Sequence, residues 1–200
     1  MSKINVGIIG VGKAGFLFGM AVRNSHNGRV AALAAGTQAE AKAAGEKLEV
    51  ERCTGNWRDL LDDPQVQAIF VASPTNLHAE MVIAAARAGK HVLCDKPLCL
   101  SVKDADAMLE ACRSAGVLFM VGFVERFNAS FRVMKDRIRQ GHIGKPVLVR
   151  AHRSHPPRKG SWIMDDRQSG GAFLHTGCHN IDLVQWLFDS PVRSVSAEMT

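Results

Sequence analysis

A lysine and two histidines are the residues of this chain whose types and settings suggest chemistry. Lys96 lies in Asp95-Lys96-Pro97, directly after an apolar segment that is expected to be a strand. A lysine at the carboxyl end of a parallel strand points into the crevice where such sheets bind their ligands. His175 and His179 follow in the segment that opens on Gly170-Gly171. An imidazole titrates near neutral pH and a lysine stabilises negative charge on oxygen, so these residues predict proton transfer at a hydroxyl group.

A glycine-rich loop near the start of the chain predicts the cofactor. Gly10-Val11-Gly12-Lys13-Ala14-Gly15 follows the apolar stretch 4–9 and precedes a helix expected to run to about Asn24. In this pattern Gly10 permits a tight turn, Gly12 lets the backbone approach a pyrophosphate, and Gly15 allows close packing of helix on strand. The phosphates would meet the helix N-terminus, whose free N–H groups and dipole attract anions. A dinucleotide beside Lys96 and His179 predicts an enzyme that transfers a hydride.

No acid stands where a dinucleotide-binding domain usually holds the ribose 2′-hydroxyl. The end of the second predicted strand reads Ala34-Ala35-Gly36-Thr37-Gln38, and the next acid is Glu40. Without a carboxylate at the strand end, the repulsion of a 2′-phosphate is removed. Thr37 is a candidate hydrogen-bond partner for that phosphate and Lys42 a candidate counter-charge. The sequence therefore favours NADP(H), or use of both nicotinamide cofactors, over NAD alone.

These residues need a scaffold, and the first part of the chain alternates short apolar runs with helical patterns. Such alternation predicts an α/β fold with a doubly wound parallel sheet, the Rossmann arrangement. We expect strands at 4–9, 30–35, near 52, and at 66–72, 91–93 and 117–121, with helices at 38–48, 57–61, 76–88 and between Ser101 and Gly116. Two helices are expected to bury stripes at helical spacing, Leu77, Met81, Ala84 and Ala88 in one and Val102, Ala105, Leu109 and Cys112 in the other.

The pattern changes after Gly122, where we place the boundary between a Rossmann domain (1–122) and the start of a second domain (123–200). Beyond this boundary the sequence predicts helices at 130–140 and 170–188, strands at 146–150 and 192–199, and a loop at 155–160.

Composition places the chain among globular proteins. Its 200 residues are 46% hydrophobic and 22% charged, and no apolar run is long enough to span a bilayer. No charged-then-apolar signal segment is seen, so we expect a cytoplasmic protein with no membrane partner. Five cysteines form no CxxC pair, which favours reduced thiols. The absence of tyrosine excludes mechanisms that need a tyrosine acid.

A basic stretch leaves nucleic-acid binding open as an alternative. Between Arg126 and Lys159 ten Lys and Arg residues accompany one acid, Asp136, in a chain of net charge +6. No interleaved aromatic residues accompany this charge. A solvated face, or attraction of dinucleotide phosphates, is favoured, and no nucleic-acid partner is expected.

The spacing of His175 and His179 leaves a metal site open as a second alternative. A zinc protease motif requires Glu after the first histidine, and Thr176 stands there. We therefore expect no metal, although these side chains would be its candidate ligands: His175, Cys178, His179, Asp182, His152 and His155.

Several ordered motifs resemble the Gfo/Idh/MocA oxidoreductases, the group of glucose-fructose oxidoreductase and inositol dehydrogenase. Asp95-Lys96-Pro97 stands where the family typically has Glu-Lys-Pro. The other matching motifs, which extend the resemblance over nearly the whole chain, are the glycine loop, Ala72 to Asn76 with His78, 89–92, Gly122 to Asn128, Gly141-x-Ile143-Gly144 and 170–182.

The resemblance implies a Rossmann domain followed by an α/β domain with a large open antiparallel sheet. One face of that sheet helps to form the substrate pocket, and the other commonly forms the contact of a homo-oligomer. The implied substrate is a sugar, an inositol or a related polyol, and the implied cofactor is NAD(P).

The resemblance also implies roles for single residues. Lys96 would touch both the nicotinamide ribose and the substrate hydroxyl, His179 would be the acid/base, and His175 would contact the substrate. The expected cofactor-binding residues are Gly10, Gly12, Lys13, Ala14, Gly15, Thr37, Ser73, Pro74, Thr75, Asn76, His78, Asp95 and Lys96. The expected substrate-binding residues are Lys96, Arg126, Asn128, Trp162, His175 and His179.

The chain departs from the family in two places. His175 stands where the family usually has an Asp, so that position supplies no fixed negative charge. The chain also stops at Thr200, in the middle of the second domain as the family builds it, so we expect a truncated sheet. Both departures keep a rival function open, a non-catalytic dinucleotide-binding sensor or assembly protein. Asp182, three residues after His179, either orients that imidazole or forms a local cap.

Overall fold

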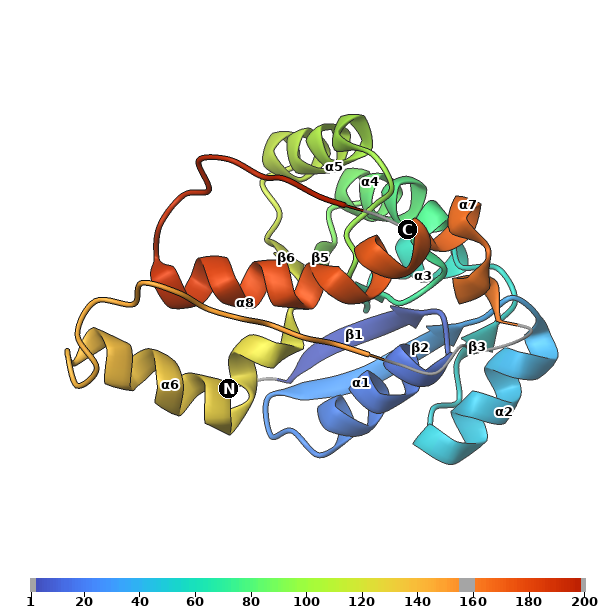
Figure 1. Ribbon diagram of the computed structural model, residues 1–200. Helices are drawn as coiled ribbons and strands as arrows, with labels where there is room; N and C mark the ends of the chain where they lie inside the picture. Colours follow the sequence, from blue (N-terminus) through green and yellow to red (C-terminus); the bar gives the residue numbers. More distant parts are fainter. Residues whose placement is uncertain (1–2, 155–160, 199–200) are drawn as a thin grey trace.

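The computed structural model describes residues 3–154 and 161–198, and a six-stranded parallel sheet lies at its centre (Figure 1). The strands are β1 (Ile4–Ile9), β2 (Gly28–Ala34), β3 (Cys53–Thr54), β4 (Ala68–Val71), β5 (His91–Cys94) and β6 (Phe119–Val121). Their order in the sheet, β3-β2-β1-β4-β5-β6, confirms the predicted doubly wound fold. In this order β2 and β3 are added on one side of β1, and β4, β5 and β6 are added on the other. Ligands of such sheets bind at the carboxyl ends of the strands, beside the point where the strand order reverses.

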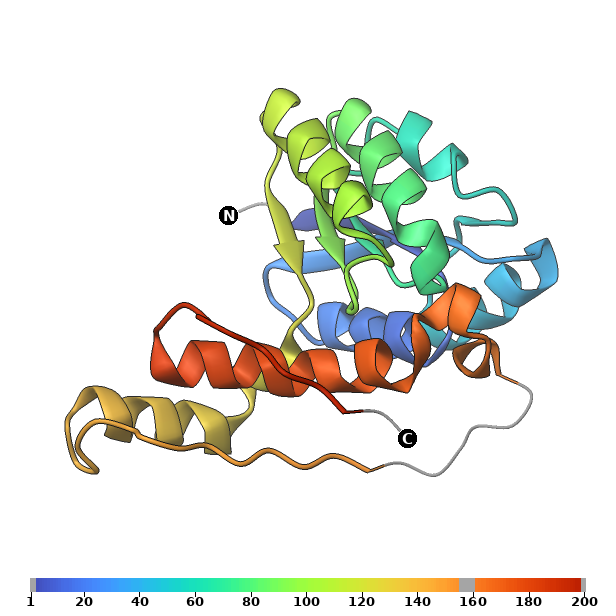
Figure 2. The same cartoon turned by 45° about the horizontal axis from the view of Figure 1, so that its top comes forward.

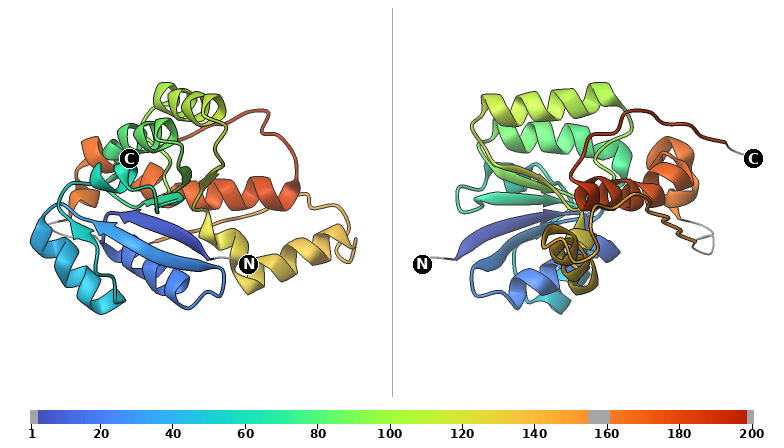
Figure 3. Two further views of the ribbon diagram at one scale, coloured as in Figure 1. Left: turned by 180° about the vertical axis from the view of Figure 1, so that it is seen from behind. Right: turned by 60° about the vertical axis from the view of Figure 1, so that its left-hand side comes forward.

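Helices cover both faces of the sheet (Figures 2 and 3). The two that pack on one face are α1 (Lys13–Arg23) and α2 (Gln38–Leu48), and the two on the other are α4 (His78–Arg87) and α5 (Val102–Ser114). Two short helices, α3 (Asp59–Asp62) and η1 (Thr75–Leu77), lie in the connections. Each face buries its own apolar cluster, and the strand side chains Ile8 and Ile69 are fully inaccessible to solvent. None of the described helices has the length and apolar character that crossing a membrane requires.

The predicted apolar stripe of α5 is wrong in part. Val102 and Leu109 are 79% and 47% exposed, whereas Met108 is completely buried and Cys112 nearly so. At about 100° per residue, Val102 and Leu109 lie roughly 80–100° around the helix from the buried side. In α4 the buried side likewise includes His78, Met81, Val82, Ala85 and Ala86, and the predicted stripe member Ala88 is exposed.

Beyond β6 the described residues form helices and no further strand. They are η2 (Val124–Phe127), α6 (Ala129–Arg139), η3 (Trp162–Met164), α7 (Asp166–Ser169), η4 (Phe173–Gly177) and α8 (Cys178–Phe188). The long helices α6 and α8 lie side by side (Figures 1 and 2), joined where Nζ of Lys135 donates to the carbonyl of Trp186 at 2.5 Å. The segment η4 is a π-helical turn that leads directly into α8.

The strands predicted at 146–150 and 192–199 do not form in the described residues, and no antiparallel sheet is seen there. Val147 and Leu148 are 95% and 78% exposed. An extended segment is stable as a strand only when a neighbour pairs with it and covers its apolar face. No such neighbour lies beside these segments in the described part of the chain. The predicted loop 155–160 and the strand's expected end at Met199 lie outside the described residues.

Candidate active site

The glycine loop connects β1 to α1 in a conformation that excludes larger side chains at two positions. Gly10 has a φ of +94°, and a Cβ there would come within 2.6 Å of the carbonyl oxygen of Ala72. A Cβ on Gly15 would lie 1.9 Å from the carbonyl oxygen of Gly10. Gly12 differs from both, because a Cβ there would meet no atom of the described chain within 4 Å. The loop is therefore packed at its two ends and open at its middle.

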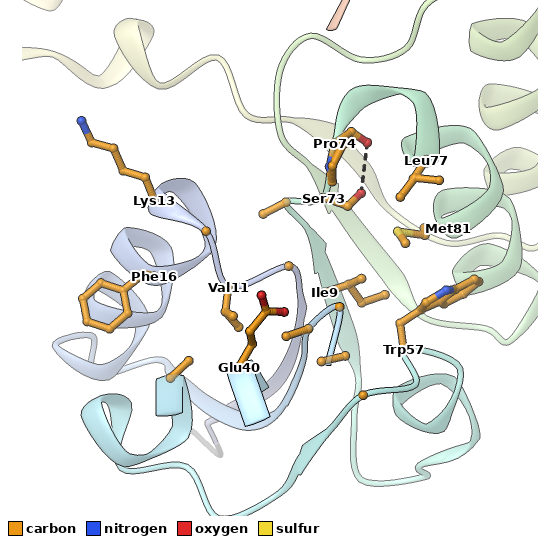
Figure 4. Close-up of a pocket in the computed structure, with 18 of the residues that line it drawn as sticks. Ile9, Val11, Lys13, Phe16, Glu40, Trp57, Ser73, Pro74, Leu77 and Met81 are labelled. Carbon is orange, nitrogen blue, oxygen red and sulfur yellow. Dashed lines mark hydrogen bonds between the residues drawn. The ribbon is translucent and has the colours of Figure 1, made fainter. Parts of the chain in front are cut away.

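The open side of the loop borders a cleft of about 940 Å³ (Figure 4). The cleft lies at the carboxyl ends of β1, β2 and β4, beside the reversal in strand order. Its walls carry few charged groups and many small or apolar side chains, which suits a nucleotide. Among the predicted cofactor residues, Gly10, Gly12, Lys13, Ser73 and Pro74 line it.

The N-terminus of α1 opens onto this cleft without a cap. Among the described residues no side chain caps the helix at Gly12, and its first turn holds no acid. The orphan N–H groups of an uncapped helix start, together with the helix dipole, favour an anion. The residues present therefore fit the pyrophosphate of a dinucleotide.

His78 connects the cleft-lining loop after β4 with the loop that carries Lys96. Its Nε2 lies 2.9 Å from the carbonyl oxygen of Ser73, and its Nδ1 lies 3.0 Å from that of Pro97. The ring is buried at the start of α4. His78 was predicted to bind the cofactor, and in the structure its ring contacts the chain itself, at both loops.

Lys96 reaches from the end of β5 to the π-helical turn. Its Nζ donates to the carbonyl oxygen of His175 at 3.2 Å. The preceding residue, Asp95, is half-buried, and burial raises the pKa of its carboxyl despite the neighbouring Lys96 charge. The imidazole of His175 packs edge-on against Trp162, with ring centroids 5.5 Å apart. Because Trp162 also lines the cleft, the nucleotide cleft and the Lys96 region are contiguous.

His179 lies in the first turn of α8 and is only 7% exposed. Burial lowers the pKa of His179 from 6.5 to about 4, and the positive charges of Lys96 and Arg153 act in the same direction. Glu125 and Asp182 oppose this shift. The Nδ1 atom is buried and has no hydrogen-bond partner in the described part of the chain. The ring is therefore uncharged near neutral pH.

Two ion pairs connect α8 and its surroundings to η2. Nε and Nη2 of Arg126 donate to the two carboxylate oxygens of Asp182 at 2.8 and 2.5 Å. Nη2 of Arg153 donates to Glu125 at 2.6 Å. The Asp182 contact raises the pKa of Arg126. Within the described residues Asp182 neither hydrogen-bonds an imidazole nor caps a helix; its carboxylate forms a bidentate ion pair with Arg126 of η2.

Two other predicted site residues are occupied as helix caps. Thr37 and Asn128 cap α2 and α6, since each accepts a hydrogen bond from a backbone N–H in the first turn of its helix. Thr75 is buried and Asn76 is exposed, next to the cleft-lining Pro74. Sequence reasoning missed Glu125 and Arg153, which are 28 residues apart and carry no motif that pairs them. It also passed over Glu40 as a site residue, although the Thr37-x-x-Glu40 spacing of a capping box places it on the first turn of α2, beside the cleft.

The histidines and acids of this region do not gather as metal ligands do. In residues 3–154 and 161–198 no three His, Cys, Asp or Glu side chains lie close enough together to hold a metal ion. His155, one of the candidate ligands, lies outside the described residues.

Comparison with known proteins assigns both parts of the chain. A family model described as an oxidoreductase family with an NAD-binding Rossmann fold matches residues 4–123, and a Gfo/Idh/MocA C-terminal domain model matches residues 131–200. A myo-inositol 2-dehydrogenase of Thermotoga maritima is 34% identical over 98% of this chain and 58% of its own length. A scyllo-inositol 2-dehydrogenase (NAD+) of Bacillus subtilis is 28% identical over 97% of this chain and 56% of its own length.

Solved structures show the same relationship. A probable dehydrogenase from Thermotoga maritima superposes with a TM-score of 0.84 at 33% identity, over 94% of this chain and 56% of that one. A levoglucosan dehydrogenase in complex with NADH and levoglucosan superposes with a TM-score of 0.82 at 30% identity, over 93% of this chain and 54% of that one. The chain thus spans little more than half the length of these relatives. Because the NAD-binding family model covers more than half of the chain, the chain belongs to the Gfo/Idh/MocA family of oxidoreductases.

Proposed function

We propose that the protein transfers a hydride between a nicotinamide cofactor and a hydroxyl-bearing carbon of a sugar, inositol or related polyol. The observation that carries the proposal is the placement of Lys96, held 3.2 Å from the His175 carbonyl and close in space to the buried, neutral His179. This group of side chains adjoins the nucleotide cleft through Trp162. Relatives that cover most of the chain carry the names of inositol dehydrogenases, which supports this class of substrate.

The cofactor would lie in the cleft, with its pyrophosphate at Gly12 and the uncapped start of α1. A bound nicotinamide ring supplies the site that accepts or donates the hydride. The chain's own residues perform the rest of the chemistry. The sequence favoured NADP(H) or dual use because no acid ends the second strand. The structure places Glu40 beside that position, so this preference is not carried into the proposal.

Two side chains act on the substrate hydroxyl, one on its negative charge and one on its proton. The Lys96 ammonium stabilises the negative charge that develops on the substrate oxygen as its proton leaves. The neutral imidazole of His179 takes that proton, and the nearby Glu125 and Asp182 stabilise the imidazolium that results. His175 contacts the substrate, and its carbonyl orients Lys96 through the 3.2 Å hydrogen bond.

Arg126 and Asn128 were predicted to touch the substrate, and we propose a different use for Arg126. Its guanidinium is held by both oxygens of Asp182, so it positions α8 and thereby His179. For Asn128 the proposal retains the predicted contact with the substrate. In the structure its side chain caps α6.

The experiment that tests the function measures cofactor reduction with a panel of inositols and sugars. Lys96→Met removes the charge but keeps the length of the side chain, and it should lower turnover by roughly 10²–10³-fold while cofactor binding and folding persist. Lys90→Met would disturb the fold, so the exposed Lys103→Met is the matched control and should retain turnover. Turnover of the Lys96 variant at the normal rate would overturn the assignment. Binding of cofactor without turnover on any substrate would favour the rival, a non-catalytic dinucleotide-binding sensor.

A further inference from the structure

The second helix that borders the cleft begins very differently from the first. At α2, Oγ1 of Thr37 accepts a hydrogen bond from the N–H of Glu40 at 3.2 Å, and the Glu40 carboxylate accepts one from the N–H of Thr37 at 3.1 Å. This reciprocal capping box satisfies the helix start internally and places a negative charge on it. The start of α1, by contrast, has neither a side-chain cap nor an acid in its first turn within the described chain.

The Glu40 carboxylate takes the place that an acid at the strand end would occupy. A Cβ on Gly36, just beyond the end of β2, would lie 3.2 Å from Oε2 of Glu40. Glu40 and Gly36 both line the cleft, and Figure 4 shows Glu40 projecting into it on the side of the glycine loop. A carboxylate at this point of a dinucleotide cleft accepts hydrogen bonds from a ribose 2′-hydroxyl and repels a 2′-phosphate.

Polar groups of Thr37 and Gln38 that could bind a 2′-phosphate already form hydrogen bonds within the chain. The N–H of Thr37 donates to the Glu40 carboxylate, and the oxygen of its hydroxyl accepts from the N–H of Glu40. The side chain of Gln38 donates to the carbonyl of Cys53 at 2.8 Å and accepts from the N–H of Gly55 at 2.9 Å. A phosphate at this helix start would have to displace the Glu40 carboxylate from the capping box before it could gain those N–H groups.

The two lysines that line the cleft do not offset this charge. Lys13 projects away from Glu40 in Figure 4. Lys47 is on the same helix as Glu40, but seven residues later, which places its Cα about 10 Å further along the helix axis.

We propose that Glu40 determines cofactor specificity and makes the site select NAD(H) over NADP(H). This inference rests on the proposed function, because it concerns the cofactor that the function requires. It reverses the preference that the sequence suggested, since the missing acid of β2 is supplied from the first turn of α2.

Direct titration with NADH and NADPH, followed by nicotinamide fluorescence at fixed ionic strength, tests the proposal without any turnover. The unmodified chain should bind NADH roughly ten- to thirtyfold more tightly than NADPH, which is the size expected for one exposed carboxylate facing a doubly charged phosphate. Glu40→Gln keeps an oxygen that can accept from Thr37 but removes the charge. It should tighten NADPH binding by roughly tenfold and change NADH binding by less than about threefold.

Glu46→Gln is the matched control, because it removes the same charge from the same helix. Glu46 does not line the cleft; it lies beside a separate hollow near Cys53. This variant should keep the NADH-to-NADPH ratio of the unmodified chain. Raising the salt concentration should shrink that ratio in the unmodified chain and leave it nearly unchanged in Glu40→Gln, because salt screens exposed charges.

Three results would overturn the proposal. Equal or tighter binding of NADPH by the unmodified chain would do so, as would an unchanged ratio in Glu40→Gln, and either would leave the oxidoreductase function intact. Binding of neither cofactor by a chain whose circular dichroism and melting show it to be folded would overturn the specificity and the proposed function together.

Discussion

The two parts of this molecule are stabilised by different interactions. The buried apolar side chains up to β6 pack on the two faces of one sheet, whereas beyond β6 the described residues contribute only Leu183 and Leu187 to the buried apolar group. In their place the second part has ion pairs and lysine contacts to carbonyls, among them the Arg126–Asp182 and Arg153–Glu125 pairs. The cleft is therefore held in shape by close packing, whereas the position of His179 depends on charged contacts.

The glycine loop is where close packing should be least tolerant of change. Gly15→Ala would place a Cβ 1.9 Å from the Gly10 carbonyl oxygen, and neither backbone segment can move without displacing α1 from the sheet. We expect a cost of about 3 kcal/mol or more, a large share of the stability of an ordinary domain, which thermal melting followed by circular dichroism would measure. Gly12→Ala, where the Cβ has open space, should leave melting nearly unchanged and weaken cofactor binding. Equal melting temperatures for the two variants would contradict this difference.

A pair of methionines compares the two parts directly. Met108 is completely buried in α5, whereas Met134 in α6 is 44% exposed. Met108→Ala should lower the free energy of unfolding by about 2–5 kcal/mol, and Met134→Ala by less than about 1 kcal/mol. Urea denaturation of both variants provides the measurement. If Met134→Ala proved the more damaging, the second part would have an apolar core of its own.

The Arg126–Asp182 pair tests whether charge positions α8. Asp182→Asn keeps the shape of the side chain but removes its charge, and we expect a loss of about 1–3 kcal/mol because Asp182 is only 7% exposed. The same change lowers the pKa of His179 further, since Asp182 is one of the groups that raise it. Asp136→Asn, on the exposed side of α6, is the control and should change neither the free energy of unfolding nor the pKa of His179. Denaturation curves and the histidine resonances in NMR spectra would report the two effects separately.

His179 also gives the stability of the folded chain a dependence on pH. Because burial lowers its pKa from 6.5 to about 4, the unfolded chain binds a proton at this residue between those pH values and the folded chain does not. Its contribution is therefore fully present above pH 6.5 and is lost as the pH falls toward 4, by about 1–3 kcal/mol. His179→Asn should flatten the stability profile over that interval. His26→Asn, at an exposed position, should follow the unmodified chain.

Sequence reasoning predicted the sheet well because its signals are local. Short apolar runs followed by glycine or capping residues predict strands and helix starts, and Thr37 and Ser101 cap their helices as such residues do. Periodicity was less informative for α5, because an apolar pattern indicates a helix without showing which of its apolar residues face the sheet. Val102 and Leu109 fit the spacing yet lie beside the buried side.

The site itself could be predicted only in part. Lys96 and His179 were proposed as site residues from their settings at a strand end and in a glycine-rich segment, and the structure brings the two near each other. The ion pair between Arg126 and Asp182 was not predicted, because the two residues are 56 positions apart and only the folded chain brings them together. The predicted strands after residue 145 fail for a related reason, since strand pairing is a property of two segments and the sequence of one does not reveal the other.

The π-helical turn η4 sets the rotational phase between the two histidines. A π turn is an α-helix that has accommodated one additional residue, which shifts everything before it by about 100° around the axis. His175 lies inside this turn, and His179 lies just after it in α8. Deletion of one residue between Phe173 and Gly177 would restore regular α-helix and turn the His175 carbonyl away from Lys96 while His179 stayed in place. Removing one residue here would therefore change the position of the His175 carbonyl without changing that of His179, which a substitution of either residue would not do.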